Sequence, residues 1–222
     1  MRLQSLGDYH GTTMIFSSFT FLVFFTIFFT IYFLARNNHF VQNRIILAGS
    51  LIFYGWWDWR FLFLIAITIV MDYHIGAKLH ATENTSQRKR LVGISVALNL
   101  SILGFFKYFN FFSDSLSSSL NYLGIEASYV TLNIILPVGI SFYIFQSLSY
   151  VVDIYRKDVK PAKSLVDYGA YVALFPQLVA GPIERGYHLL PQITAPRTIT
   201  REKIYEGSYP VSYTHLRAPE TD

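Results

Sequence analysis

The feature that most constrains the fold of this chain is an uncharged run of 21 residues at 15–35, IFSSFTFLVFFTIFFTIYFLA. As an α-helix with a rise of 1.5 Å per residue, such a run covers the roughly 30 Å hydrocarbon core of a bilayer. A cleaved signal peptide is the alternative, but it has a shorter apolar stretch and a small-residue cleavage site. The run ends at Ala35-Arg36-Asn37 without such a site. The sequence therefore predicts a first membrane span that is retained.

The composition supports a membrane protein along the whole chain. Hydrophobic residues make up 52% of the 222 residues and charged residues only 14%, whereas a soluble domain has about 25% charged residues. A charged side chain at the centre of a membrane helix costs on the order of 3 kcal/mol, which accounts for the shortage. The chain has no cysteine, which excludes disulfides, thiol nucleophiles and thiolate metal sites.

Further apolar stretches predict spans at about 44–57, 61–78, 91–112 and 130–152. A sixth stretch, 166–183, contains Pro176, Gly181 and Pro182, which break or bend a helix. If this stretch crossed the membrane, the basic residues that follow it would lie outside the cell. A re-entrant or interfacial element is therefore favoured over a full crossing. The predicted fold class is all-α, a polytopic transmembrane helical bundle.

The orientation is predicted from the basic residues, because cytoplasmic loops are enriched in Lys and Arg. Linkers 36–44, 78–90 and 153–165 are predicted to be cytoplasmic, and the N-terminus to lie outside. The net charge of +4 follows from this topology, so no nucleic-acid partner is expected. The three linkers hold ten basic residues, Arg36, Arg44, Lys78, Arg88, Lys89, Arg90, Arg156, Lys157, Lys160 and Lys163, against two, Arg60 and Lys107, in the alternate linkers 58–60 and 107–129.

The fifth predicted span has a polar face. Lipid cannot solvate these groups, so the face is expected to look into the protein or into a wet cavity. Hydrogen bonding between helices is the alternative role. The candidates for lining a tunnel are Tyr143, Gln146, Ser149 and Asp153. At helical spacing, one stripe holds Gly139, Phe142, Gln146, Ser149, Asp153 and Arg156, and its neighbour holds Tyr143, Ser147 and Tyr150.

Ionisable residues elsewhere give weaker candidates. Asp72 and His74 lie close to the cytoplasmic end of the third span, and solvation near the interface is the favoured interpretation of both. Glu184 and Arg185 follow Gly181-Pro182-Ile183 and either line the mouth of a cavity or are only solvated. The sequence has no phosphate-binding loop, zinc-ligand spacing or nucleophile elbow, and no metal site is expected.

Several segments resemble a known family. The start MIFSS at 14–18, FYGWW at 53–57, GFFKYFNFF at 104–112, LPVGISFYIFQSLSYVVDIYR at 136–156 and FPQLVAGPIER at 175–185 are similar to membrane-bound O-acyltransferases of the alginate O-acetyltransferase branch. The resemblance covers about residues 14–208. The related D-alanyl-lipoteichoic acid transferases share the architecture and are the nearest alternative within the family.

The resemblance implies a helical bundle around a tunnel in the bacterial cytoplasmic (inner) membrane. An acyl group from a cytoplasmic donor, such as acetyl-CoA or an acyl carrier, would pass to an extracytoplasmic polysaccharide hydroxyl or a periplasmic partner transferase. Membrane lipid and the polysaccharide synthesis machinery are the other expected partners, and no bound cofactor is expected. The essential histidine of the family lies in a later span, so none of His74, His80, His188 and His215 matches it. No catalytic residue is therefore expected in this chain, which alone should be inactive.

The two ends are expected to differ from the rest of the chain. Residues 1–13 are polar and are interpreted as an upstream extension, with Met14 as a candidate natural start. Residues 209–222 form a polar run where the family continues into another apolar span. They resemble translated sequencing-adapter read-through, so the bundle is expected to be incomplete at the C-terminus. A transporter or channel is the alternative from another functional class, although the 136–156 pattern has no second copy in the chain.

Overall fold

The computed structural model describes residues 18–122, 137, 139–181, 184–197 and 205, and this part of the chain is helical without any strand. The predicted all-α fold class is confirmed. Two continuous helical stretches, His39–Ala81 and Thr85–Tyr122, are long and apolar enough to cross a membrane, and Phe19–Leu34 is a shorter apolar helix. The helices are α1 (Phe19–Leu34), α2 (His39–Asp58), α3 (Leu62–Ala81), α4 (Thr85–Tyr122), α5 (Ile140–Arg156), α6 (Leu165–Val172), α7 (Phe175–Ala180) and α8 (Gly186–Thr194), with a 3₁₀ turn, η1 (Trp59–Phe61), between α2 and α3.

Helices occupy the described parts of the first five predicted spans. α2 and α3 form a hairpin around η1, where the Asp58 carboxylate accepts a hydrogen bond from the backbone N–H of Arg60 at 3.0 Å. α5 begins directly after Gly139, whose φ of 75° favours glycine. Positions 130–136 of the predicted fifth span lie outside the described residues. Length and composition alone do not decide which helices cross the bilayer, so the span boundaries stay predictions.

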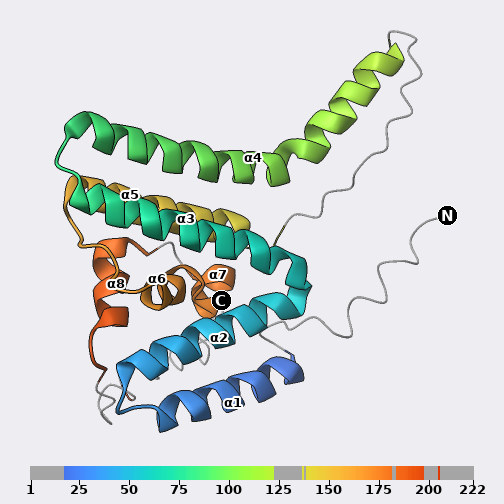
Figure 1. Ribbon diagram of the computed structural model, residues 1–222. Helices are drawn as coiled ribbons and strands as arrows, with labels where there is room; N and C mark the ends of the chain where they lie inside the picture. The colour runs from blue at the N-terminus through green and yellow to red at the C-terminus, as the bar shows by residue number, and fades with distance from the viewer. Residues whose placement is uncertain (1–17, 123–136, 138, 182–183, 198–204, 206–222) are drawn as a thin grey trace, which may run out of the picture.

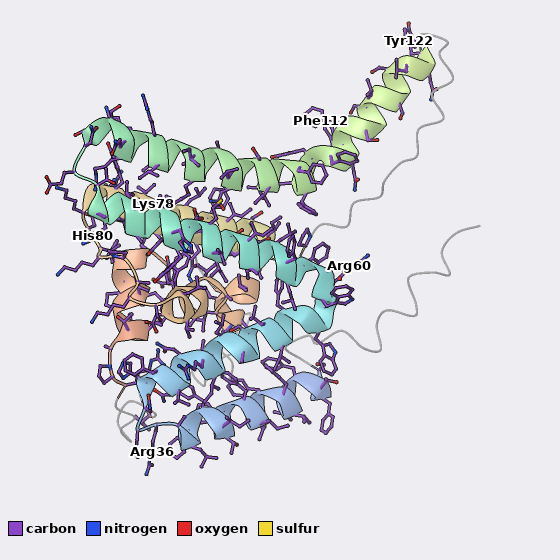
Figure 2. All side chains as sticks on the ribbon, in the orientation of Figure 1. Arg36, Arg60, Lys78, His80, Phe112 and Tyr122 are labelled. Carbon is purple, nitrogen blue, oxygen red and sulfur yellow. The ribbon has the colours of Figure 1, made fainter. Side chains whose placement is uncertain are left out.

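The fourth helical segment extends beyond the predicted membrane span at 91–112. α4 continues to Tyr122 through a serine-rich stretch, because that stretch contains neither proline nor glycine to break the helix. The predicted linker 107–129 is therefore helical as far as Tyr122, and the point at which the membrane span ends within α4 stays a prediction. Figure 1 shows α4 bent, and Figure 2 places its end, from Phe112 to Tyr122, away from the other helices.

The helices stack in layers (Figure 1). α1 lies against α2, and α2 contacts α6 and α7. On the other side of these short helices, α3 packs against α5, and α4 covers both as the outermost layer. At Gly76 of α3, an added Cβ would lie 2.9 Å from side-chain atoms of Ile154 and Tyr150 of α5. This glycine lets the two helices approach closely, as small residues do between membrane helices.

The sixth apolar stretch is not one helix. α6 has eight residues and α7 has six, with Ala173 and Leu174 between them. Eight residues at 1.5 Å each give about 12 Å, well short of the hydrocarbon core. Pro176 lies in the first turn of α7, where its missing N–H needs no partner, and the backbone N–H of Phe175 donates to Ser50 Oγ of α2 at 3.2 Å. The depth of this segment in the membrane stays a prediction.

The basic linkers gather at one end of the bundle. Figure 2 places Arg36, Lys78 and His80 at the same end, whereas Arg60 lies at the opposite end. The alternating pattern of basic residues predicts that the linkers rich in Lys and Arg lie on one side of the membrane. The separation of these residues from Arg60 agrees with that prediction.

Arg88 joins three helices at this end. Its guanidinium donates to the carbonyls of Leu79 and Thr82, in the last turn of α3 and just after it, and to those of Ile154 and Tyr155 in the last turn of α5. It also lies 5.6 Å from the centre of the Tyr155 ring. Carbonyls at a helix C-terminus lack intrahelical partners and carry partial negative charge. A buried cation is therefore favoured at this position.

Candidate functional site

The polar face of α5 is turned largely into the protein. Gln146 and Asp153 are 3% and 4% exposed, and Tyr143 is fully buried. Ser149 is half-buried, whereas Phe142 and Arg156, placed on the same stripe, are exposed. The buried face is therefore centred between the two predicted stripes. A role for these residues in lining a tunnel stays a prediction.

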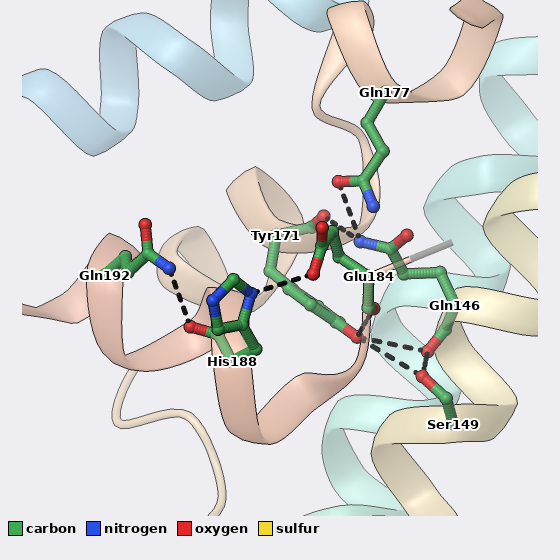
Figure 3. Close-up of polar contacts among 7 residues, drawn as sticks. All are labelled: Gln146, Ser149, Tyr171, Gln177, Glu184, His188 and Gln192. Carbon is green, nitrogen blue, oxygen red and sulfur yellow. Dashed lines mark hydrogen bonds and ion pairs between the residues drawn. The ribbon is translucent and has the colours of Figure 1, made fainter. Parts of the chain in front are cut away.

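Gln146 joins α5 to the two short helices that follow (Figure 3). Its side-chain Nε2 donates to the Tyr171 carbonyl in α6 at 2.9 Å and to Gln177 Oε1 in α7 at 3.3 Å. α6 ends at Val172, so the Tyr171 carbonyl lies in its last turn and lacks an intrahelical partner. A primary amide satisfies such a carbonyl while it also bonds a second side chain. Gln146 therefore holds the break between α6 and α7 in place.

The Tyr171 hydroxyl connects this amide to the segment before α8. It donates to the Glu184 carbonyl at 3.2 Å, and lies 3.4 Å from both the Gln146 carbonyl and Ser149 Oγ. The Ser149 hydroxyl donates to the Gln146 carbonyl at 2.8 Å. Figure 3 shows these groups converging between α5, α6 and the segment before α8. We call the set Gln146, Ser149, Tyr171, Gln177 and Glu184 the Gln146 cluster.

At the edge of the Gln146 cluster, Glu184 Oε2 lies 2.8 Å from His188 Nδ1. The side chains are 37% and 61% exposed, respectively, so water screens the pair and it contributes little stability. No third group of the described residues completes this pair into a nucleophile site.

Asp153 lies at the N-terminus of α8. Its carboxylate faces the backbone N–H groups of Gly186 and Tyr187, and a Cβ added to Gly186 would lie 3.3 Å from Asp153 Oδ2. Unpaired N–H groups at a helix N-terminus favour a negative charge. Asp153 thus anchors α8 to α5, whereas Arg185, the other predicted residue here, is exposed.

The expected solvation of Asp72 is wrong. Asp72 is fully buried, and its two carboxylate oxygens accept from Ser95 Oγ at 2.7 Å and Asn99 Nδ2 at 2.8 Å. α4 packs over α3 at this point and shields the carboxylate, which no local pattern reveals. His74, by contrast, is exposed, as expected. Asp72 belongs to a separate α3–α4 cluster, although the Ser147 hydroxyl of α5 also faces it.

Four buried side chains in the described part of the chain have a polar atom without a hydrogen-bond partner: Gln42, Asn99, Tyr143 and Asp153. Buried polar groups are normally paired, so such atoms need an explanation. Tyr143, a predicted site residue, packs edge-on against Tyr54 at 6.4 Å between ring centres. No group of His, Asp and Glu suited to a metal occurs in the described ranges.

Sequence reasoning missed Tyr171, Gln177 and His188. Gln177 stands in the FPQLVAGPIER segment, so its residue type and place beside Pro176 gave a signal. The sequence around Tyr171 gave no such signal, because its hydroxyl reaches its hydrogen-bond partners only when α6 packs against α5. His188 was seen but not paired with Glu184, although the i, i+4 spacing on a helix would have suggested it.

Curated relatives match most of this chain. The "Probable alginate O-acetylase AlgI" of Azotobacter vinelandii is 41% identical over 195 residues, 87% of this chain and 38% of the relative. The protein of the same name from Pseudomonas aeruginosa is 40% identical over 195 residues, 87% of this chain and 37% of the relative. These similarities confirm the resemblance of the chain to the alginate O-acetylase branch of the membrane-bound O-acyltransferase family.

The alginate O-acetylase relatives are longer than this chain, which spans about two fifths of their length. A "Peptidoglycan O-acetyltransferase" of Helicobacter pylori is 31% identical over 182 residues, 71% of this chain and 33% of the relative. No protein-family model matches the chain, and no solved structure matches it. Four of the five residues of the Gln146 cluster, all except Tyr171, fall within the segments that first suggested the family, 136–156 and 175–185.

Proposed function

We propose that this chain forms part of an O-acetyltransferase that moves an acetyl group across the membrane to a hydroxyl of an exopolysaccharide such as alginate. The observation that supports this most is the 41% identity over 195 residues with an alginate O-acetylase. The donor would be cytoplasmic, either acetyl-CoA or an acyl carrier. The acceptor step would involve a periplasmic partner transferase and the polysaccharide synthesis machinery.

The described residues would act in positioning rather than in chemistry. The Gln146 cluster ties α5, α6, α7 and the start of α8 together. An acyl-transfer path requires the reacting groups to be held in a fixed geometry, because a misplacement of 1 Å can lower the rate about a hundredfold. We assign no catalytic base to the described residues. A transporter is disfavoured, since the relatives are named O-acetyltransferases.

A second acceptor class has support from one observation. The Helicobacter pylori relative is named a peptidoglycan O-acetyltransferase and is 31% identical over 182 residues. Another polymer of the cell envelope could therefore take the place of the exopolysaccharide. The D-alanyl transfer reaction expected as the nearest alternative has no relative of that name among these matches.

Substituting Gln146 tests this proposal. In the complete protein encoded by the natural gene, Gln146→Leu should lower acetyl ester content on the cell-surface polymer by on the order of tenfold to a hundredfold, because the α6–α7 break loses its tie. Acetyl content is measured on isolated alginate-type polysaccharide and on peptidoglycan, which also distinguishes the two acceptors. Protein abundance is measured in the same membranes.

Phe145→Leu is the matched control, since Phe145 is the neighbouring residue and is 44% exposed on the outer face of α5. It should leave acetylation near the wild-type level. If Gln146→Leu left both acetylation and protein abundance unchanged, the Gln146 cluster would have no role in acetyl transfer. No acetyl ester on either polymer in the wild type would contradict the function itself.

The proposed location is the bacterial inner membrane, with the basic end of the bundle in the cytoplasm and the N-terminus outside. The chain has no cysteine, so single cysteines can report its orientation. Ser86→Cys and Lys160→Cys should resist a membrane-impermeant maleimide added to intact cells, and both should react after the membrane is made permeable. Trp59→Cys, at the opposite end and 75% exposed, should react in intact cells. The reverse pattern would invert the topology.

A further inference from the structure

A pocket opens between the last turn of α3 and the first turns of α4. Its volume is about 370 Å³, and it is lined by Lys78, Ala81, Thr82, Gln87, Arg90 and Leu91. On each helix the lining residues follow helical spacing, so the pocket is the groove between two adjacent helix faces. It lies at the end of the bundle that holds Arg36 and His80 (Figure 2).

The charge of this pocket is positive and uncompensated. The side chains of Lys78 and Arg90 make no ion pair or hydrogen bond with any described residue. No acidic side chain lines the pocket in the described part of the chain, and Glu83 lies in the linker beside it. Arg88 is excluded, because its guanidinium is bound to carbonyls of α3 and α5 on the inner side. Two free cations in one pocket favour an anion with several acceptor oxygens.

The surface next to the pocket is exposed and, apart from His74, apolar. On α3, the exposed His74 lies one turn before Lys78 and is preceded by Val70 and Ile67, and on α4, Ile94 and Leu98 follow Arg90 at helical spacing. The four apolar side chains are all exposed. A phosphate at the end of an open apolar groove has the chemistry of a membrane lipid, not of a free ion.

We propose that this pocket binds the headgroup of an anionic phospholipid, with its acyl chains along the groove between α3 and α4. Lys78 and Arg90 contact the phosphate oxygens, and the Thr82 hydroxyl and Gln87 amide lie within the same pocket. Basic pockets between membrane helices on the cytoplasmic side bind anionic headgroups, and each Lys or Arg near the surface adds to the attraction. This site is independent of the acetyl-transfer function.

Native mass spectrometry of the full 222-residue chain, released from micelles with added lipid, tests the site. The chain should retain phosphatidylglycerol over phosphatidylethanolamine with the same acyl chains. Lys78→Gln/Arg90→Gln should lower the retained phosphatidylglycerol by about thirtyfold, since two charges near the headgroup are lost. Ala81→Glu, which keeps both cations but adds a carboxylate to the pocket, should have a similar effect.

Arg44→Gln/Lys89→Gln is the matched control, because it removes one arginine and one lysine at exposed cytoplasmic-end positions outside the pocket. It should keep the preference for phosphatidylglycerol. An equal loss in this control would mean diffuse attraction, and equal retention of the two lipids would overturn the site. Displacement of the lipid by millimolar inorganic phosphate would identify the ligand as a soluble phosphate instead. Gel filtration of each variant separates lost binding from misfolding.

Discussion

Replacing Arg88 by leucine is expected to lower the free energy of unfolding by about 3 kcal/mol. A hydrogen bond to a charged group contributes about 1.5–3 kcal/mol, and Arg88 donates to carbonyls at the ends of both α3 and α5. Water at this end of the bundle recovers part of this loss, so the bonds do not add in full. The change should appear as a fall of about 6–12 °C in the unfolding midpoint of the purified chain in detergent.

Two variants separate this effect from a general loss of charge. Arg88→Lys keeps the charge but lacks the planar fork of donors, so it should be intermediate. Arg90→Leu removes an exposed arginine two residues away and should change stability by less than about 0.5 kcal/mol. Equal effects of Arg88→Leu and Arg90→Leu would show that the carbonyl contacts contribute no net stability.

Asp72→Leu is expected to destabilise the chain by about 3 kcal/mol. The substitution leaves two fully buried donors, Ser95 Oγ and Asn99 Nδ2, without the carboxylate that accepts from them. Removing one partner of a buried polar pair costs more than replacing both by apolar groups. The triple variant Asp72→Leu/Ser95→Ala/Asn99→Leu should therefore recover much of the loss in the unfolding midpoint.

Asp158→Leu is the control for this prediction, because it makes the same chemical change at an exposed position after α5. It should leave the midpoint within about 2 °C. If the triple variant were no more stable than Asp72→Leu, packing volume rather than hydrogen bonding would account for the loss.

Sequence reasoning predicted the features that depend on local pattern. The helices α1 to α3 follow from apolar runs, and the inward polar face of α5 follows from the spacing of Tyr143, Gln146 and Asp153. Pro176 predicted an interruption of the sixth apolar stretch, which is divided into α6 and α7. The family resemblance was also visible in the sequence and was confirmed by the relatives.

Some features of the structure were not predicted, because no local pattern in the sequence indicates them. The length of α4 is one such feature: proline, glycine and caps mark helix ends, and the serine-rich stretch after Phe112 has neither proline nor glycine, so the sequence did not indicate an end at Tyr122. The burial of Asp72 was missed because its hydrogen-bond partners, Ser95 and Asn99, belong to another helix, α4, and lie more than 20 positions away in the sequence. The run of three basic residues at 88–90 likewise does not indicate that the Arg88 guanidinium binds backbone carbonyls of other helices whereas Arg90 is exposed.

The uncharged run at 15–35 and the low content of charge determined by themselves that this chain forms apolar helices, because the cost of a charge in a bilayer acts on each residue separately. The polar face of α5 was determined in the same way, by spacing alone. Only the tertiary structure decided what that face meets: the end of α6 at Tyr171, Gln177 in α7 and the start of α8 at Gly186. Such contacts join residues 25 or more positions apart, and their partners are chosen by the packing of whole helices rather than by any local preference.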